Sequence, residues 1–147
     1  MAITVSIDVS GAQDKIRKIK EGLADLTDPF EQSGEEIIEL YGEKNFKEQG
    51  GALGMRWKSL SARTLLARQN RTGHYANPPI ETDKILIWTG ALKSGFKKIV
   101  EKTTLIVENT VVYFKFNQGS RTMIKATRDV IDIVSKYVID HLRSITK

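Results

Sequence analysis

The spacing of hydrophobic and polar residues predicts a strand and a helix at the start of the chain. Apolar residues alternate with polar ones from Ile3 to Val9, which is the period of a half-buried strand. A helix is expected to begin at Ser10, because Ser10 and Gln13 form a capping-box pair and apolar positions then recur at helical spacing. Its buried face would consist of Ala12, Ile16, Ile19, Leu23 and Leu26.

A second helix is expected from Pro29, which suits a first helical turn, with Asp28 as its cap. The pair Gly50-Gly51 would end this helix. Its apolar positions predict burial of Phe30, Ile37, Ile38 and Tyr41. Its glutamates would face solvent, at Glu31, Glu35, Glu36, Glu39, Glu43 and Glu48.

Residues 50–84 are rich in glycine, proline and asparagine, which predicts a loop-rich insertion with one short helix begun by Ser61. Residues 98–109 and 111–119 are expected to form two strands that turn at Asn109-Thr110. A long amphipathic helix follows, with apolar positions at Val130, Val134, Tyr137, Val138, Leu142 and Ile145. The pattern predicts one α+β domain over residues 1–147, in which several helices pack a small antiparallel sheet.

Composition narrows the class of protein. The chain has 147 residues, of which 40% are hydrophobic and 28% charged, and this balance is typical of one globular domain. No run reaches the ~20 apolar residues of a membrane helix, and the N-terminus lacks the pattern of a signal peptide. The chain has no cysteine, which removes disulfides and thiolate metal sites and fits synthesis in a reducing cytoplasm.

Charge is distributed unevenly along the chain. Residues 1–50 hold 6 basic and 11 acidic residues (net −5), and residues 51–147 hold 17 and 7 (net +10). Opposite charges on one chain attract copies head to tail. We therefore expect Glu35, Glu39 and Glu43 of one copy to lie near the basic segment of the next, which contains Arg56, Lys58, Arg63, Arg68 and Arg71. The alternatives are contact between the two halves within a monomer, or simple solvation.

Residues with catalytic or ligand chemistry are sparse. His74 and His141 are isolated, whereas a metal site needs three or four ligands. The sequence also lacks a phosphate-binding glycine loop and a G-x-S-x-G elbow. No catalytic, cofactor or metal site is therefore expected, although a small nuclease or toxin with an unrecognised site remains an alternative. The basic segment, with Trp57 and Tyr75 among its cations, is also compatible with a nucleic-acid-binding module.

Three motifs occur in a fixed order along the chain. The first consists of Trp57, Leu60, Ser61, Thr64 and Leu65. The second consists of Leu86, Thr89, Gly90, Leu92 and, displaced by one position, Ser94. The third consists of Tyr113, Asn117, Gln118 and Gly119. Within the second motif, Thr89 is expected to cap a short helix over residues 90–96, and Gly90 to allow close approach where the chain turns.

In order and spacing, these motifs resemble the phage virion morphogenesis family, the tail-completion and head–tail joining proteins of Mu-like tailed phages. The family's I-P-A-R string is replaced by Ile124-Lys125-Ala126-Thr127. The resemblance implies a non-enzymatic structural protein without a cofactor or a membrane. It implies a homo-oligomeric ring, a hexamer or dodecamer, at the head–tail junction or tail end. Its partners would be neighbouring connector and tail tube proteins and packaged DNA, in a virion assembled in the host bacterial cytoplasm.

Overall fold

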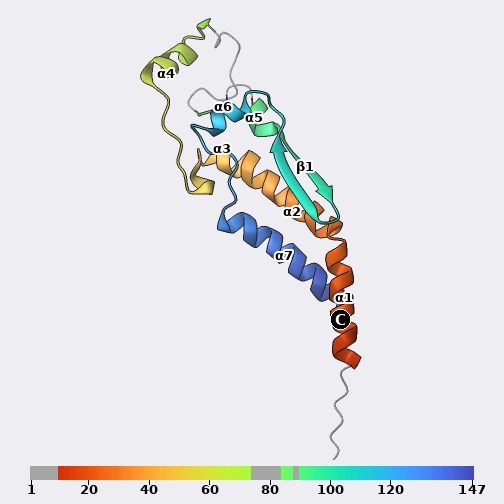
Figure 1. Ribbon diagram of the computed structural model, residues 1–147. Coiled ribbons are helices and arrows are strands. Elements are labelled where there is room, and N and C mark those ends of the chain that lie inside the picture. Colours follow the sequence, from red (N-terminus) through yellow and green to blue (C-terminus); the bar gives the residue numbers. More distant parts are fainter. Residues whose placement is uncertain (1–9, 74–83, 88–89) are drawn as a thin grey trace, which may run out of the picture.

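Helices and one hairpin make up the structure, a computed structural model that describes residues 10–73, 84–87 and 90–147 (Figure 1). The elements are α1 (Ser10–Ala24), α2 (Thr27–Glu39), the π-helical η1 (Leu40–Lys44), α3 (Asn45–Lys47), the 3₁₀ turn η2 (Gly51–Leu53), α4 (Ala62–Gln69), α5 (Ala91–Ser94), β1 (Phe96–Glu101), β2 (Thr104–Asn109), α6 (Phe114–Gln118) and α7 (Arg128–Ile145). The predicted α+β class, with a small antiparallel sheet and a long C-terminal helix, is confirmed. The strand expected over residues 3–9 lies outside the described residues.

α2 lies between the β1–β2 hairpin and α7 and contacts both (Figure 1). The prediction of its buried face is confirmed, since Phe30, Ile37 and Tyr41 are at most 8% exposed and Ile38 is half-buried. The glutamates lie on the opposite side and are exposed, except for the half-buried Glu36. One helix thus contributes buried side chains to the core and exposed glutamates to the surface.

α2 begins at Thr27, two residues before the predicted start at Pro29. The reason is that Asp25, rather than Asp28, makes the first hydrogen bonds. Its Oδ1 accepts from the Thr27 hydroxyl at 2.6 Å and from the Thr27 backbone N at 3.1 Å, and these bonds lower the pKa of Asp25. The helical path then continues through η1 and α3 and ends before Gly50, which has a φ of 91°, close to the predicted end.

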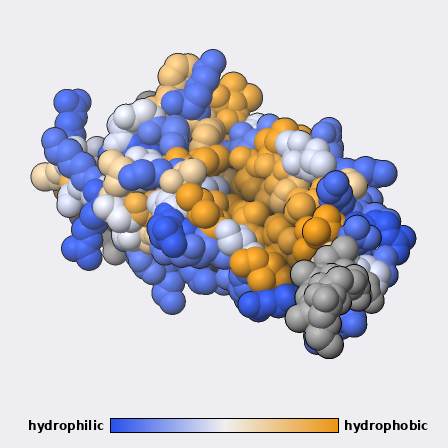
Figure 2. Space-filling model, turned by 60° about the horizontal axis from the view of Figure 1, so that its bottom comes forward, coloured by the Kyte–Doolittle hydropathy of each residue, from blue (hydrophilic) through white to orange (hydrophobic). Residues whose placement is uncertain are grey.

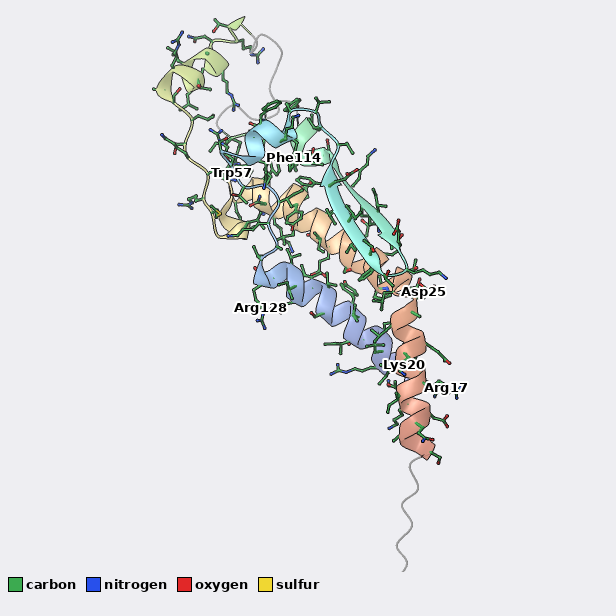
Figure 3. The ribbon with its side chains drawn as sticks, in the orientation of Figure 1. Arg17, Lys20, Asp25, Trp57, Phe114 and Arg128 are labelled. Carbon is green, nitrogen blue, oxygen red and sulfur yellow. The ribbon has the colours of Figure 1, made fainter. Side chains whose placement is uncertain are left out.

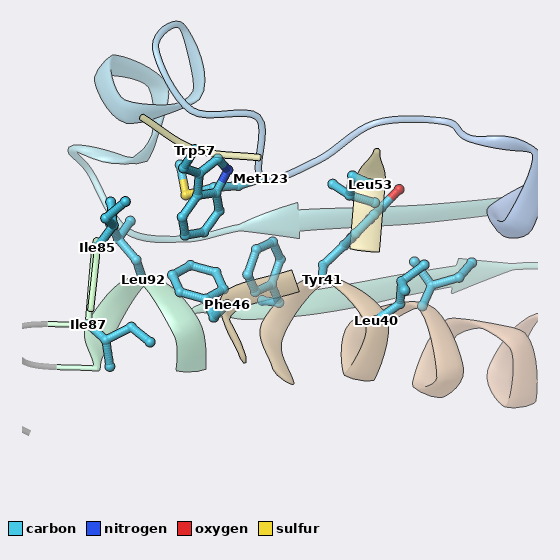
Figure 4. Close-up of a cluster of buried hydrophobic side chains, with 11 residues drawn as sticks. Leu40, Tyr41, Phe46, Leu53, Trp57, Ile85, Ile87, Leu92 and Met123 are labelled. Atoms are coloured by element: carbon cyan, nitrogen blue, oxygen red, sulfur yellow. The ribbon is translucent and has the colours of Figure 1, made fainter. Parts of the chain in front are cut away.

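The core is built on aromatic side chains from distant parts of the chain. Phe46 is fully buried, and its ring meets Trp57 edge to face at a centroid distance of 5.1 Å. A second edge contact joins Phe46 to Phe96 at 6.3 Å. Leu92 and Met123 fill the space around these rings (Figure 4). Such edge-to-face pairs add about 0.5–1.5 kcal/mol each to the stabilisation from burial, and they fix the geometry of the cluster.

Residues 121–127, here called the crossing segment, run across this core and are held by side chains from other elements. Two donors meet the Thr122 carbonyl oxygen, Trp57 Nε1 at 2.9 Å and Asn45 Nδ2 at 3.3 Å. The Tyr41 hydroxyl donates to the Lys125 carbonyl at 2.9 Å. Gln118 accepts from the backbone N of residues 123 and 124 and donates to the carbonyl of residue 124. These bonds satisfy an irregular backbone that would otherwise be costly to bury.

The predicted hairpin is wrong in its position. β1 pairs with β2 in antiparallel register, with Phe96 opposite Asn109 and Glu101 opposite Thr104, so the turn lies at residues 102–103 and not at Asn109-Thr110. Residues 111–119, predicted as the second strand, contain the short helix α6 instead. Residues 98–109, predicted as one strand, therefore extend over both strands of one hairpin.

Asn109 explains why the chain leaves the sheet. Its Nδ2 donates to the Leu92 carbonyl at 2.7 Å, and its Oδ1 accepts from the Val111 backbone N at 3.1 Å. The backbone N of Thr110 donates to the Gly95 carbonyl at 2.9 Å. These bonds turn the backbone at the end of β2, so the alternating residues that follow have no neighbouring strand to pair with.

α1 and α7 appear where the sequence predicts them, but their apolar faces are less buried than expected. On α1, Ile16 is 55%, Ile19 38% and Leu23 44% exposed, and Gly22 is the buried residue, packed against Leu142 and Ile145 of α7. Figure 3 shows Arg17 and Lys20 extending from the same helix. The expected burial of the α1 stripe is wrong because α1 extends past the end of α2, where α7 is its main neighbour among the described elements (Figure 1).

The core analysis predicts a large difference between two phenylalanines. Phe46→Ala should lower the free energy of unfolding by about 3–5 kcal/mol, because it leaves a cavity at a fully buried site. Phe116→Ala is the matched control, since Phe116 is 71% exposed, and it should change the free energy by less than about 0.5 kcal/mol. Urea denaturation followed by circular dichroism measures both. Similar losses for the two variants would contradict the described core.

Candidate functional site

The basic segment forms a projecting arm. The basic arm, residues 56–73, contains α4, which extends away from α2 and the hairpin (Figure 1). The prediction that Ser61 begins this helix is confirmed, because the Ser61 hydroxyl oxygen accepts from the Thr64 backbone N at 3.1 Å. Four cations on the arm are exposed, namely Arg56, Lys58, Arg63 and Arg71. Among the residues that the structure describes, no acidic side chain forms an ion pair with any of these four.

Arg68, expected at a subunit interface, is instead a structural residue. Its side chain is only 6% exposed, and its Nη1 donates to the Lys84 carbonyl at 2.7 Å. Arg68 therefore holds one side of α4 toward the body of the molecule. Leu66 lies on the opposite side of the helix and is 58% exposed. The charge count alone did not distinguish an inward arginine from an outward one.

The glutamates of α2 and η1 border a groove of about 610 Å³, here called the acidic groove. Glu35, Glu36, Glu39 and Glu43 line it, and Ile38 and Phe96 give it an apolar surface. Tyr137 of α7 donates to Glu36 at 3.0 Å, which raises the pKa of the tyrosine. The three glutamates predicted at an interface, Glu35, Glu39 and Glu43, are thus brought to one concave site.

Three lysines partly neutralise this acidic surface within the monomer, Lys93 and Lys98 from the second half of the chain and Lys44 from the first. Lys98 of β1 lies 2.6 Å from both Glu31 and Glu35. Burial lowers the pKa of Lys98, but its bonds to the two glutamates outweigh this effect, so the pKa is raised overall. Lys93 meets Glu43 at 2.8 Å, and Lys44 approaches Glu39 at 3.8 Å.

Contact between the acidic and basic halves within one monomer, one of the sequence alternatives, therefore occurs through Lys93 and Lys98. It does not occur through the basic arm, which forms no ion pair with the acidic groove among the described residues. The groove is lined by four glutamates and two lysines, Lys44 and Lys93, which leaves a net charge of −2. Two surfaces of opposite charge thus remain on different parts of the molecule.

The motif residues mainly support the fold. Trp57 and Leu92 are buried, and Leu60 and Leu86 pack against the core. Thr64 takes part in the Ser61 cap, and Gly90, with a φ of 78°, is the N-cap of α5. Tyr113 and Gly119 flank α6, and Tyr113 is 45% exposed. The capping role expected of Thr89 lies outside the described residues.

Sequence reasoning missed two apolar features. The first is the exposed Leu66, which lies on the side of α4 opposite the buried Arg68. The second feature is a groove of about 360 Å³ between β2, α2 and α7, lined by Leu105, Val107, Val130 and Val134 among others. Figure 2 shows hydrophobic side chains gathered in a hollow on one face of the molecule. α7 closes this groove only in part.

The described part of the chain contains no cluster of three or more side chains that could hold a metal ion. His141 lies beside Asp25 in a shallow pocket of about 390 Å³ and helps to lower the pKa of that carboxyl. His74 falls outside the described residues. None of the described helices is both long and apolar enough to cross a bilayer.

The two arginines of α4 should behave differently. Arg68→Ala should lower the free energy of opening of α4 by about 1.5–3 kcal/mol, since a buried charged hydrogen bond to the Lys84 carbonyl is lost. Arg63→Ala, on the exposed side of the same helix, should change it by less than about 0.5 kcal/mol. Amide hydrogen exchange across Ala62–Gln69 measures both variants. Equal protection in the two would contradict the structural role of Arg68.

Comparison of the chain with protein-family models, with curated proteins and with solved structures gives no match. The function must therefore be inferred from the chain's own residues: the basic arm, the acidic groove and the order of the three motifs.

Proposed function

We propose that this chain is a structural protein of a tailed-phage virion that assembles into a ring at the head–tail junction or at the tail end. One observation carries the proposal. A cationic arm and a concave anionic site lie on different parts of one small domain, and neither is neutralised by the other. Such a pair of surfaces suits repeated contact between identical copies better than it suits chemistry on a small substrate.

A contact between two different surfaces has a geometric consequence. Each copy offers an arm to one neighbour and a groove to another, so the contact is heterologous. If the rotation between successive copies closes, the product is a ring, and if it does not close, the product is a filament. The resemblance of the motif order to head–tail joining and tail-completion proteins favours the closed form, with six or twelve copies.

The place of the motif residues in the fold supports this function indirectly. Trp57 connects the start of the basic arm to the core through its bond to the Thr122 carbonyl (Figure 3). Leu92 fixes α5 beside the acidic groove, since Lys93 and Ser94 of that helix line it. The motifs would thus set the relative positions of the two charged surfaces. Neighbouring connector and tail tube proteins would bind the assembled ring within the virion.

The ring proposal predicts a discrete assembly from the purified full chain. Native mass spectrometry at low ionic strength should give one dominant species of six or twelve copies, and negative-stain imaging should show closed rings. Because charged surfaces are screened over ~8 Å at physiological salt, raising the salt should shift the population toward monomers. A chain that stays monomeric at all concentrations and salts, with its helices intact, would refute the proposal.

The exposed cations of the basic arm favour nucleic-acid binding as the second candidate. If Arg56, Lys58, Arg63 and Arg71 all contact phosphates, log K for duplex DNA should fall with log salt with a slope of about −3.6, which is −0.9 for each cation. Fluorescence anisotropy with the monomeric chain measures this slope, and Lys97→Ala on β1 is a control outside the arm. If the chain forms rings but does not bind DNA in this way, nucleic-acid binding is ruled out as its function.

A further inference from the structure

We infer that α4 of one copy docks in the acidic groove of the next copy, with Leu66 entering the groove and Arg63 pairing with Glu39. The inference rests on the proposed ring and names the surfaces that join its subunits. It changes the interface suggested by charge alone in two respects. Arg68 is removed from the interface, and an apolar side chain is placed at its centre.

The exposed side of α4 has the composition of a docking surface. Arg63 and Leu66 are three residues apart, so their side chains are neighbours on the helix surface. Leu66, in the middle of α4, is 58% exposed, and burial of its side chain at an interface would be favourable. One apolar side chain beside a cation matches a site that has an apolar floor and an acidic border.

Contacts on the inner side of α4 hold the helix so that Arg63 and Leu66 stay exposed. Arg68 is buried and donates to the Lys84 carbonyl, and Ser61 caps the start of the helix. Trp57, four residues before Ser61, is held in the core by its bond to the Thr122 carbonyl. Because both ends of the arm's helix have fixed partners, little conformational entropy is lost when its outer side docks. The same bonds hold α4 so that Leu66, on the side opposite Arg68, stays exposed.

The acidic groove has the size and chemistry to receive that surface. Its volume of about 610 Å³ is several times the ~150 Å³ of a cavity that encloses one benzene molecule, so a leucine side chain and part of an arginine fit within it. Ile38 and Phe96 provide apolar contacts for Leu66. The glutamates at its border discriminate in favour of a cationic helix.

Glu39 is the acid best placed to accept a new partner. Glu35 lies 2.6 Å from Lys98, and Glu43 lies 2.8 Å from Lys93, whereas Glu39 approaches Lys44 only at 3.8 Å. The Glu39 side chain is 59% exposed. An arginine from a neighbouring copy can therefore pair with Glu39 without displacing a short ion pair.

The heterologous geometry allows a test with two complementary variants. Leu66→Asp disables the arm and leaves the groove intact, whereas Glu39→Arg disables the groove and leaves the arm intact. Both sites are exposed, so both variants should fold, and thermal melting checks this. Each variant alone should be monomeric, because loss of a central contact weakens the joint on the order of 30-fold, about 2 kcal/mol at 1.4 kcal/mol per tenfold.

Mixing the two variants gives the decisive measurement. The groove of the Leu66→Asp chain and the arm of the Glu39→Arg chain can still join once, so native mass spectrometry should show a 1:1 heterodimer and nothing larger. Arg63→Glu combined with Glu39→Arg in one chain should restore the ring. Glu108→Arg, an acid-to-base change on β2 outside the groove, is the matched control and should leave assembly unchanged.

The failure of this contact is distinguishable from failure of the ring. If the wild-type chain forms rings and both single variants do so with equal strength, the docking is wrong and the ring is joined elsewhere. Separate monomers in the mixture, when each variant alone is monomeric, would also overturn the docking. If the wild-type chain itself never assembles, the proposed function and the docking are both refuted.

Discussion

The packing of the basic arm, the core and the start of α7 depends on one hydrogen-bond acceptor, the carbonyl oxygen of Thr122. It accepts hydrogen bonds from Trp57 and Asn45, which belong to the start of the basic arm and to α3. A single acceptor on the crossing segment thereby connects the arm to the core and sets where the chain enters α7. Met123, the next residue, is fully buried, so the backbone here can neither shift nor exchange its partners for water without opening the core.

The division of α2 into two sides connects this core to function. Its apolar side contacts the hairpin and α7, and its acidic side borders the groove. The π-helical turn η1 follows directly, and it places Leu40 and Tyr41 in the core while Glu43 stays at the groove. Lys98 then ties β1 to the same helix through Glu31 and Glu35. Since core and groove share one helix, the shape of the groove depends on how the core beneath it packs.

Much of the fold was predictable because its signals are local. The spacing of Phe30, Ile37 and Tyr41 identified the buried side of α2, and Ser61 identified the start of α4. The failures have equally specific causes. Alternation over residues 111–119 resembled a strand, but Asn109 ends β2 through bonds to Leu92 and Val111, which are partners that no local pattern reveals. The stripe on α1 predicted burial, yet Ile16 and Leu23 remain exposed because, among the described elements, α7 alone contacts α1 extensively and covers it only in part.

The sequence by itself determined the α+β class, the helical periods and the separation of negative from positive charge, since each depends on residues close together in the chain. Only the tertiary structure decided which charged side chains are exposed and available to pair with another copy of the chain. Arg63 and Arg68 are equivalent in a count of charge, but one is exposed and the other lies buried against the Lys84 carbonyl. Glu35 and Glu39 are both exposed but differ in pairing, because Glu35 lies 2.6 Å from Lys98 of β1, whereas Glu39 approaches Lys44 only at 3.8 Å. Burial and pairing depend on contacts between residues far apart in the chain, and these exist only after the chain has folded.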